Sequence, residues 1–252
     1  MPVIIVVLAA LALPRPALAQ GQEALQAFAA GDYDAALASL AGQENADSEA
    51  FAARVLLAEA LSCEADPPQD LLQAALREAN AALALDPAHV EGRIQKAIAL
   101  SMIIRPMSAM EANKTGLGEE ARNLAKSALE SDPDNPYAHG FLAVWNIEVV
   151  RRGGSLGAMV MGASVREARK HYEAAAAASP GDASVHWQWA RALAALDAKK
   201  YRKEIEAALA TAEAASPDSD LEGVMQRRAS ELHAILSSAG PKAAEARALE
   251  ML

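Results

Sequence analysis

Cysteine and aromatic residues are scarce in this sequence. Its 252 residues include one cysteine, Cys63, and aromatic side chains make up 4% of the chain. A single cysteine excludes an intramolecular disulfide and any zinc site built from several thiolates. Alanine dominates the apolar residues, which favours closely packed helices over strands. The composition therefore predicts an all-α protein, and 52% hydrophobic residues are enough for a packed core.

Basic clusters are scarce as well. The chain carries 23 lysines and arginines against 33 aspartates and glutamates, for a formal net charge of −10. Proteins that follow a phosphate backbone need a basic face. We interpret the one dense basic run, at residues 199–203, as a solvated helix start. The sequence therefore predicts no nucleic-acid partner.

The N-terminal segment has the features of a secretory signal peptide. An apolar run at residues 3–13 precedes the segment Pro14-Arg15-Pro16, and Ala17-Leu18-Ala19 resembles a small-residue cleavage site. The run is shorter than the roughly 18 to 20 residues that span a bilayer. We predict a signal peptide at 1–19, a helical-repeat domain at 20–252, a secreted and periplasmic location, and no stable membrane span after cleavage. A retained membrane anchor is the alternative. No lysine or arginine precedes the apolar run, which is a departure from the signal-peptide pattern.

An internal repeat emerges when the chain is aligned on four prolines. Pro87, Pro133, Pro180 and Pro217 each end an alanine-rich stretch. Small or apolar residues recur at three fixed positions before each proline, with spacings of four and three that place them on one helix face. These residues are Ala75, Ala79, Ala82; Ala121, Ala125, Ala128; Ala168, Tyr172, Ala175; and Ile205, Leu209, Ala212.

This pattern resembles the second helix of the tetratricopeptide repeat (TPR). After Pro180, Trp189, Ala190 and Leu193 stand where that family places the signature residues of its first helix. The resemblance covers about residues 21–237 and implies a right-handed α-solenoid of about five helical hairpins, with a C-terminal capping helix after Pro241. A non-repeating helical bundle is the alternative.

Two repeats are longer than the family pattern. Pro133 and Pro180 each follow the preceding aligned proline by more than 40 residues, against roughly 34 in a minimal repeat. The surplus falls between the two helices of a repeat, at 102–118 and 151–164, so we expect both inserts on the same side of the stack. They either pack together and enlarge the core or form a lid over a binding site. The candidate lid residues are Arg151, Arg152, Leu156, Met159 and Met161.

The resemblance also implies a binding groove, because the first helix of each repeat lines the concave face in this family. Carried onto this sequence, the candidate groove residues are Ile94, Ile98, Met102, Tyr137, Val144, Glu148, Trp187 and Arg191. This mostly apolar strip suits a segment of another polypeptide. A carboxylate such as Glu148 must reach water or a cationic partner, because burying it alone is costly.

The sequence contains no catalytic or cofactor motif. Nucleophile elbows, phosphate-binding glycine loops and zinc signatures are all absent. His139 and His186 occupy equivalent repeat positions and could approach each other, but the five histidines lack metal-motif spacing. We expect a non-enzymatic scaffold of the bacterial cell envelope, without cofactor or metal, that binds a partner polypeptide. The alternative is a periplasmic carrier or transport-accessory protein for a small apolar ligand held under the inserts.

Overall fold

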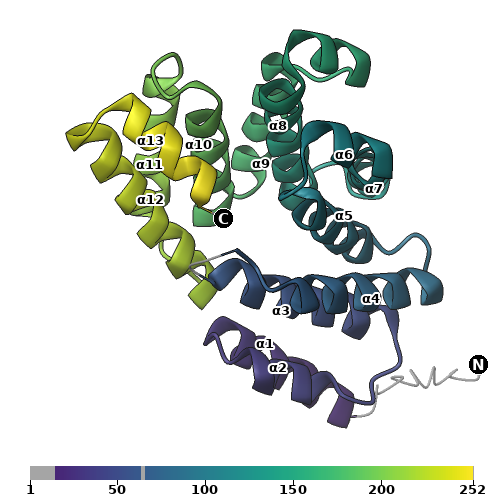
Figure 1. Cartoon of the computed structure of the whole chain (residues 1–252). Helices are drawn as coiled ribbons and strands as arrows, with labels where there is room; N and C mark the ends of the chain where they lie inside the picture. The colour runs from purple at the N-terminus through teal and green to yellow at the C-terminus, as the bar shows by residue number, and fades with distance from the viewer. Residues whose placement is uncertain (1–14, 64–65, 252) are drawn as a thin grey trace, which may run out of the picture.

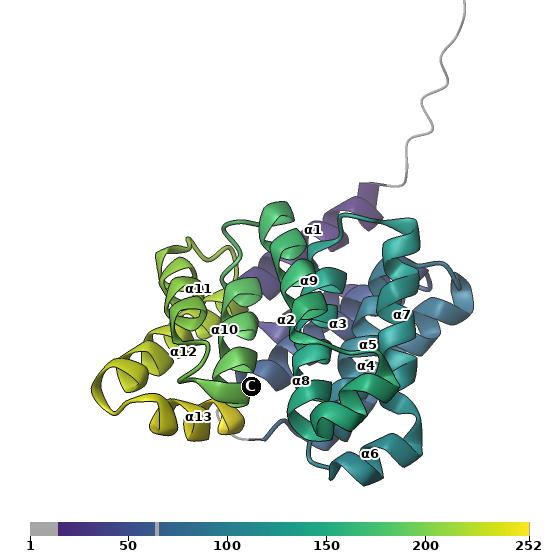
Figure 2. The same ribbon diagram turned by 90° about the horizontal axis from the view of Figure 1, so that it is seen from above.

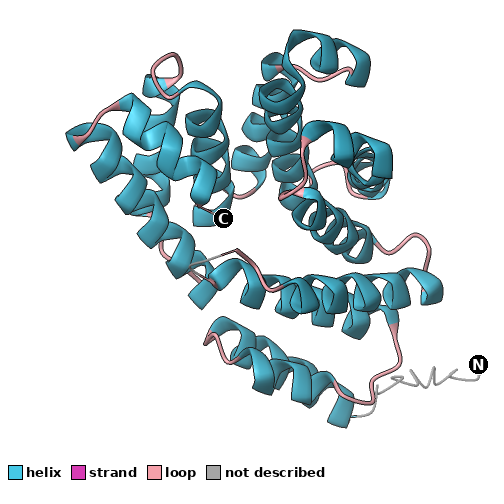
Figure 3. Ribbon diagram, viewed as in Figure 1, coloured by secondary structure: helices cyan, strands magenta, loops and turns pink. Residues whose placement is uncertain are grey.

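The computed structural model describes residues 15–63 and 66–251, and this part of the chain folds into helices and turns without strands (Figures 1 and 3). The helices are α1 (Arg15–Ala29), α2 (Tyr33–Leu40), α3 (Ala46–Ser62), α4 (Gln69–Leu85), α5 (Val90–Ile104), α6 (Ala109–Thr115), α7 (Leu117–Ser131), α8 (Pro136–Met161), α9 (Val165–Ala178), α10 (Ala183–Asp197), α11 (Arg202–Ala214), α12 (Asp220–Ser238) and α13 (Pro241–Glu250). The predicted all-α class is confirmed.

Consecutive helices pair into stacked hairpins. The pairs are α1 with α2, α3 with α4, α5 with α7, α8 with α9, and α10 with α11, followed by α12 and α13. The last helix begins at Pro241, where the sequence places a capping helix. The predicted solenoid of five hairpins is confirmed, and α12 adds one further helix between the fifth hairpin and the cap.

Each of the four aligned prolines follows the second helix of a hairpin, as the repeat predicts. The helices α4, α7, α9 and α11 end just before Pro87, Pro133, Pro180 and Pro217. The residue that precedes a proline is driven out of the helical region by the proline ring. The C-caps of α4, α7 and α9 accordingly have φ near −137°. Proline therefore ends α4, α7 and α9 and starts the turn to the next hairpin, and Pro217 lies in the turn after α11.

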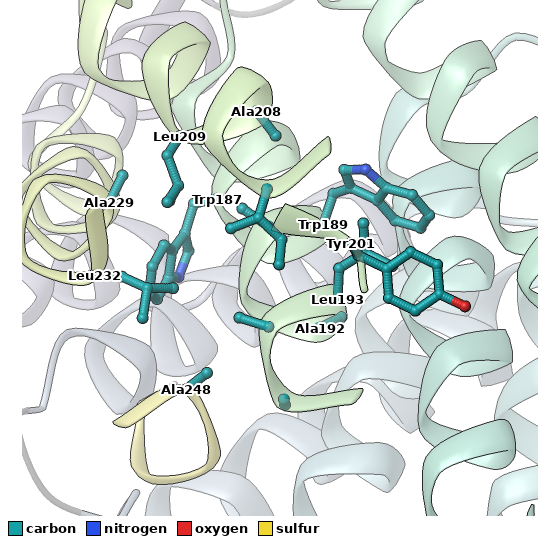
Figure 4. Packing of buried hydrophobic residues seen from close by; sticks show 14 of the residues in the cluster. Trp187, Trp189, Ala192, Leu193, Tyr201, Ala208, Leu209, Ala229, Leu232 and Ala248 are labelled. Carbon is teal, nitrogen blue, oxygen red and sulfur yellow. The ribbon is translucent and has the colours of Figure 1, made fainter. Parts of the chain in front are cut away.

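The repeated small residues lie at the contacts between helices. Of the twelve aligned positions, all except Tyr172 are fully buried. Alanine there allows the helix backbones to approach closely, and each hairpin covers the apolar face of its neighbour. A larger cluster, which includes Trp187, Leu193 and Leu232, joins α10 and α11 to α12 and α13 (Figure 4).

The solenoid curves until its two ends meet. The N-terminal end of α12 lies against α3 and α1 (Figure 1). The Arg228 guanidinium donates to the carbonyl oxygens of Leu61 and Cys63 at the end of α3, at 2.7 Å each. Asp220 stands against Gly31, so close that a Cβ on the glycine would lie 2.9 Å from the Asp220 Cβ. The described helices therefore form a closed ring.

The predicted signal peptide falls mostly outside the described part of the chain. Its apolar run lies within residues 1–14, and the predicted cleavage site lies in the first turns of α1. Among the residues that the structure describes, no helix combines the length and apolarity that a bilayer-crossing segment needs. Cleavage and the periplasmic location remain predictions.

Replacing Ala175 with leucine should destabilise the fold by overpacking, by about 1 to 3 kcal/mol. The control is Ala177→Leu on the exposed face of the same helix, which should leave stability nearly unchanged because leucine and alanine have similar helix propensities. Thermal melts followed by circular dichroism measure both variants. Equal melting temperatures for the two would mean that Ala175 is not at a helix contact.

Candidate functional site

The closed ring encloses a cavity on its concave side. Its volume is about 830 Å³, within the usual range for ligand sites. The helices α3, α5, α8, α10 and α12 supply most of the lining, and Leu249 of α13 also contributes to it. First helices of consecutive hairpins thus line the cavity, which is the placement that the repeat pattern implies.

One wall of the cavity is apolar and built by helical register. Ile98 and Met102 lie one turn apart on the same face of α5, and Leu57 and Leu61 have the same spacing on α3. Val144 of α8 extends this surface toward α10. These five side chains are the apolar wall, which offers a ligand contact without hydrogen bonds.

Four arginines gather where this wall ends. They are Arg105, Arg151, Arg152 and Arg191, here called the arginine cluster, and all four line the cavity. The carboxylate among them is Glu148, which accepts a hydrogen bond from Arg151 at 2.7 Å. Burial alone would raise the pKa of Glu148, but that hydrogen bond and the nearby arginine charges hold it below its ordinary value. The carboxylate therefore stays ionised.

Arg191 is the most buried member of the cluster. Only 8% of the residue is exposed, and its Nε donates to Oε1 of Gln188 at 3.1 Å. Burial, followed by the charge of Arg105, lowers the pKa of Arg191 to about 10. The guanidinium remains charged at neutral pH, which makes it a buried cation at the edge of the cavity.

Arg105 and Arg152 also hold the walls of the cavity together. Arg105, at the end of α5, donates to the carbonyl oxygens of Leu249 and Met251, and so ties the end of α13 across the ring. Arg152 donates to the carbonyl oxygen of Met107, which joins the two inserts. These two arginines are therefore positioned by backbone acceptors as well as by packing.

The opposite end of the cavity is acidic. Asp182, Glu222 and Tyr137 line it together with Arg54. Burial, then the charge of Asp182, raises the pKa of Glu222 above its ordinary value and that of Tyr137 to about 12. The cavity thus has charge of opposite sign at its two ends and apolar surface between them.

The two inserts stand beside the arginine cluster at the rim of the cavity. The first forms α6, which projects at the edge of the stack (Figure 2). The second is the end of α8, where Gly154, with φ 58° and ψ −161°, breaks the helix in a conformation that favours glycine. Both contribute to the cavity lining, which confirms that they emerge on the same side.

The projecting parts of the inserts do not enlarge the core. Met110, Leu156, Met159 and Val160 are between 67% and 74% exposed. The alternative in which the inserts pack together as a larger core is therefore wrong for these side chains. A cluster of exposed apolar residues at the rim of a cavity is typical of a binding surface.

The fold matches that of a solved TPR structure. It is a thermophilic TPR protein of Thermus thermophilus, which aligns with a TM-score of 0.58 over 85% of this chain and 98% of that chain, at 20% identity. This chain has the tetratricopeptide-repeat fold. No protein-family model matches its sequence, and no curated protein does. The divergent, alanine-rich character of these repeats agrees with such weak sequence similarity.

Most of the predicted groove residues line the cavity of this TPR fold. They are Ile98, Met102, Tyr137, Val144, Glu148 and Arg191, and from the insert Arg151, Arg152, Leu156 and Met161. Met159 is exposed at the rim outside the lining. The role of all these groove and insert residues in binding remains a prediction.

The predictions for Ile94 and Trp187 were wrong about their placement. Both side chains are fully buried and lie outside the cavity. Ile94 packs with Ala128 and Ala138, and Trp187 packs in the cluster that contains Leu232 (Figure 4). Bulky side chains at this repeat position fill the contact between hairpins, so they support the ring and cannot touch a ligand in the cavity.

Several cavity residues escaped prediction, and Arg54 and Arg105 are the two cations among them. Arg105 and Arg151 stand at the same distance after Pro87 and Pro133, so they occupy equivalent positions in consecutive repeats. This recurrence is a signal in the sequence. No comparable recurrence marks Arg54, whose guanidinium lies over the rings of Phe28 and Tyr137.

Two of the histidines, His139 and His186, bind the turns that precede their helices. His139 and His186 do not meet each other: their Nε2 atoms hydrogen-bond to the carbonyl oxygens of Pro133 and Pro180. His139 instead pairs with His171, with 2.9 Å between the Nδ1 atoms. Within the described residues, no group of three or more histidine, cysteine or acidic side chains could hold a metal ion.

Removing the Glu148 charge should destabilise the protein. In Glu148→Gln the arginine cluster loses its neutralising carboxylate, and we expect a loss of about 1 to 3 kcal/mol at pH 7. Because the pKa of Glu148 is lowered in the folded state, its contribution is present above the ordinary carboxylate pKa and is lost as the pH falls through the lowered value.

Denaturant unfolding at neutral and acidic pH measures this effect, with the exposed Glu130→Gln on α7 as control. The stability difference between wild type and Glu148→Gln should shrink in acid, and Glu130→Gln should match wild type. If Glu148→Gln is as stable as wild type at pH 7, the carboxylate does not offset the arginine charges.

Proposed function

We propose that this protein is a non-enzymatic scaffold that binds a segment of another polypeptide in the concave cavity of its TPR fold. The observation that carries the proposal is the cavity itself, which has an apolar wall between an arginine cluster and an acidic end. A polypeptide segment presents apolar side chains together with polar and charged groups, and this combination suits such a surface.

The polar side chains of the cavity support recognition. Glu148 is paired with Arg151, and Arg105 and Arg152 bond to backbone carbonyl oxygens. Groups held in this way are fixed in position before a ligand arrives, which lowers the entropic cost of binding. We therefore assign the cavity a binding role without chemical turnover.

We place this scaffold in the bacterial cell envelope. The support is the predicted signal peptide at residues 1–19, whose apolar run and small-residue cleavage site are features of the sequence. A partner in the same compartment, exposed outside the cytoplasm, follows from this proposal.

A second candidate function is the carriage of a small apolar molecule. The exposed Leu156, Val160 and Met110 at the rim favour it, because an apolar ligand could shelter beneath them. Native mass spectrometry of the freshly purified protein distinguishes the two candidates. A co-purifying small molecule would favour the carrier.

Site-specific photo-cross-linking in the native host tests the polypeptide proposal. A benzoylphenylalanine at Gly140, where an added Cβ meets open space in the cavity wall, should cross-link a protein. The same group at Leu85, which is exposed on α4 outside the cavity lining, should not.

A filled cavity provides the matched comparison for this experiment. Val144→Trp should abolish the adduct formed from position 140, because the indole occupies the apolar wall. Ala84→Trp, at an exposed position of α4, should leave the yield of that adduct unchanged. Absence of a polypeptide adduct at 140, or an adduct that survives Val144→Trp, would contradict the proposal.

A further inference from the structure

The arginine cluster holds more positive charge than its carboxylate neutralises. Four guanidinium groups lie near Glu148 at this end of the cavity, and the other lining carboxylate, Glu119, is paired with Arg122. Asp66 and Arg228, which lie outside the lining, add one charge of each sign nearby. In a chain with a net charge of −10, this local excess creates a positive field inside a low-dielectric cavity. Such a field attracts an anion.

Two of the guanidinium groups have unused hydrogen-bonding capacity. Among the described residues, the terminal nitrogens of Arg191 have no hydrogen-bond acceptor, and they keep some exposure to the cavity although the residue as a whole is more than nine-tenths buried. The buried Nε of Arg151 also has no partner there. A buried donor such as the Arg151 Nε is normally satisfied. The accessible end of the Arg191 guanidinium matches the two oxygens of a carboxylate or phosphate. The unused donors therefore point to an anionic group as the missing acceptor.

The apolar wall starts one helical turn from the cluster. Met102 precedes Arg105 by three residues on α5, and Val144 precedes Glu148 by four on α8, so each pair shares a helix face. An anion held by the cluster would have apolar surface directly beside it. The ligand that fits both features has an anionic group at one end of an apolar chain.

We propose that the arginine cluster is a binding site for a carboxylate or phosphate group, whose attached apolar chain lies along the apolar wall. This inference rests on the proposed binding role of the cavity and names the chemistry of its ligand. Two sources could carry the group: an acidic side chain in the partner segment, or a free amphiphile. Arg191 is the residue we expect to contribute most, because it is buried and its terminal donors face the cavity.

Isothermal titration calorimetry with three probes tests the site. Decanoate has the anionic group and the chain, 1-decanol has the chain alone, and inorganic phosphate has the anion alone. We expect decanoate to bind about tenfold more tightly than decanol, as one charge-assisted hydrogen bond suggests, and phosphate to bind more weakly than decanoate. Equal binding of decanoate and decanol would overturn the proposal.

Substitutions at Arg191 identify the site within the cavity. Arg191→Met should weaken decanoate binding about tenfold and leave decanol binding unchanged, and Arg191→Lys should restore part of the loss. Arg166→Met, at an arginine exposed on α9 outside the cavity, should bind decanoate as wild type does. Thermal melts establish that each variant is folded. A folded Arg191→Met with wild-type decanoate affinity would overturn the proposal.

A peptide arm separates the two sources of the anion. The capped tetrapeptides Leu-Leu-Leu-Glu and Leu-Leu-Leu-Gln differ in the charge of the last side chain. If the wild type binds the glutamate peptide more tightly and Arg191→Met removes this preference, the source of the anion is an acidic side chain of the partner segment. Decanoate binding without peptide binding supports the anion site with a free amphiphile as the source. If the cross-link at position 140 also fails, that result contradicts the polypeptide scaffold and leaves the anion site supported.

Discussion

Close approach of helices at buried alanines is the constraint on which this structure depends. Residues such as Ala79, Ala125 and Ala175 are fully buried at the contacts of second helices, where a larger side chain would push the hairpins apart. Because each hairpin contacts mainly its neighbours, small changes in these distances add up along the solenoid. The curvature that brings α12 back to α3 follows from the sum of these contacts.

Ring closure turns a concave surface into a deep cavity that stays open to solvent. Arg228 binds the carbonyl end of α3, and Arg105 binds the end of α13. The last carbonyl groups of a helix lack partners within it, and they carry partial negative charge that favours a cation. The arginines at these ends therefore stabilise the closure. Arg105 also belongs to the cluster that faces the cavity, which couples the shape of the site to its charge.

The sequence was sufficient to predict the local features of this fold. Repeated small residues before Pro87 and Pro133 predicted the hairpins, the buried faces and the turns, because these depend on local spacing. Surplus length between helices located both inserts. The cavity lining at Ile98, Val144 and Arg191 could also be predicted, because the repeat assigns these positions to first helices.

Ring closure and the fate of bulky groove residues could not be predicted. Contacts such as Arg228 with Leu61 join residues far apart in sequence, and they depend on the accumulated curvature of every hairpin between them. Trp187 has the position of a groove residue, but its size and the presence of α12 bury it in the core. The exposure of Leu156 depends on the break at Gly154, since a continued helix would direct it elsewhere.

A disulfide across the closure tests the enclosed cavity most directly. In a Cys63→Ser background, Gly31→Cys and Asp220→Cys place two thiols where the closed ring brings α12 against the turn after α1. The positive φ of Gly31 adds some strain to a cysteine there, but the Cβ separation needs only a small shift to reach disulfide geometry. The account predicts that mild oxidation yields an intramolecular disulfide with no free thiol in the monomer. Two thiols that stay free under the same oxidation would show an open solenoid and would contradict it.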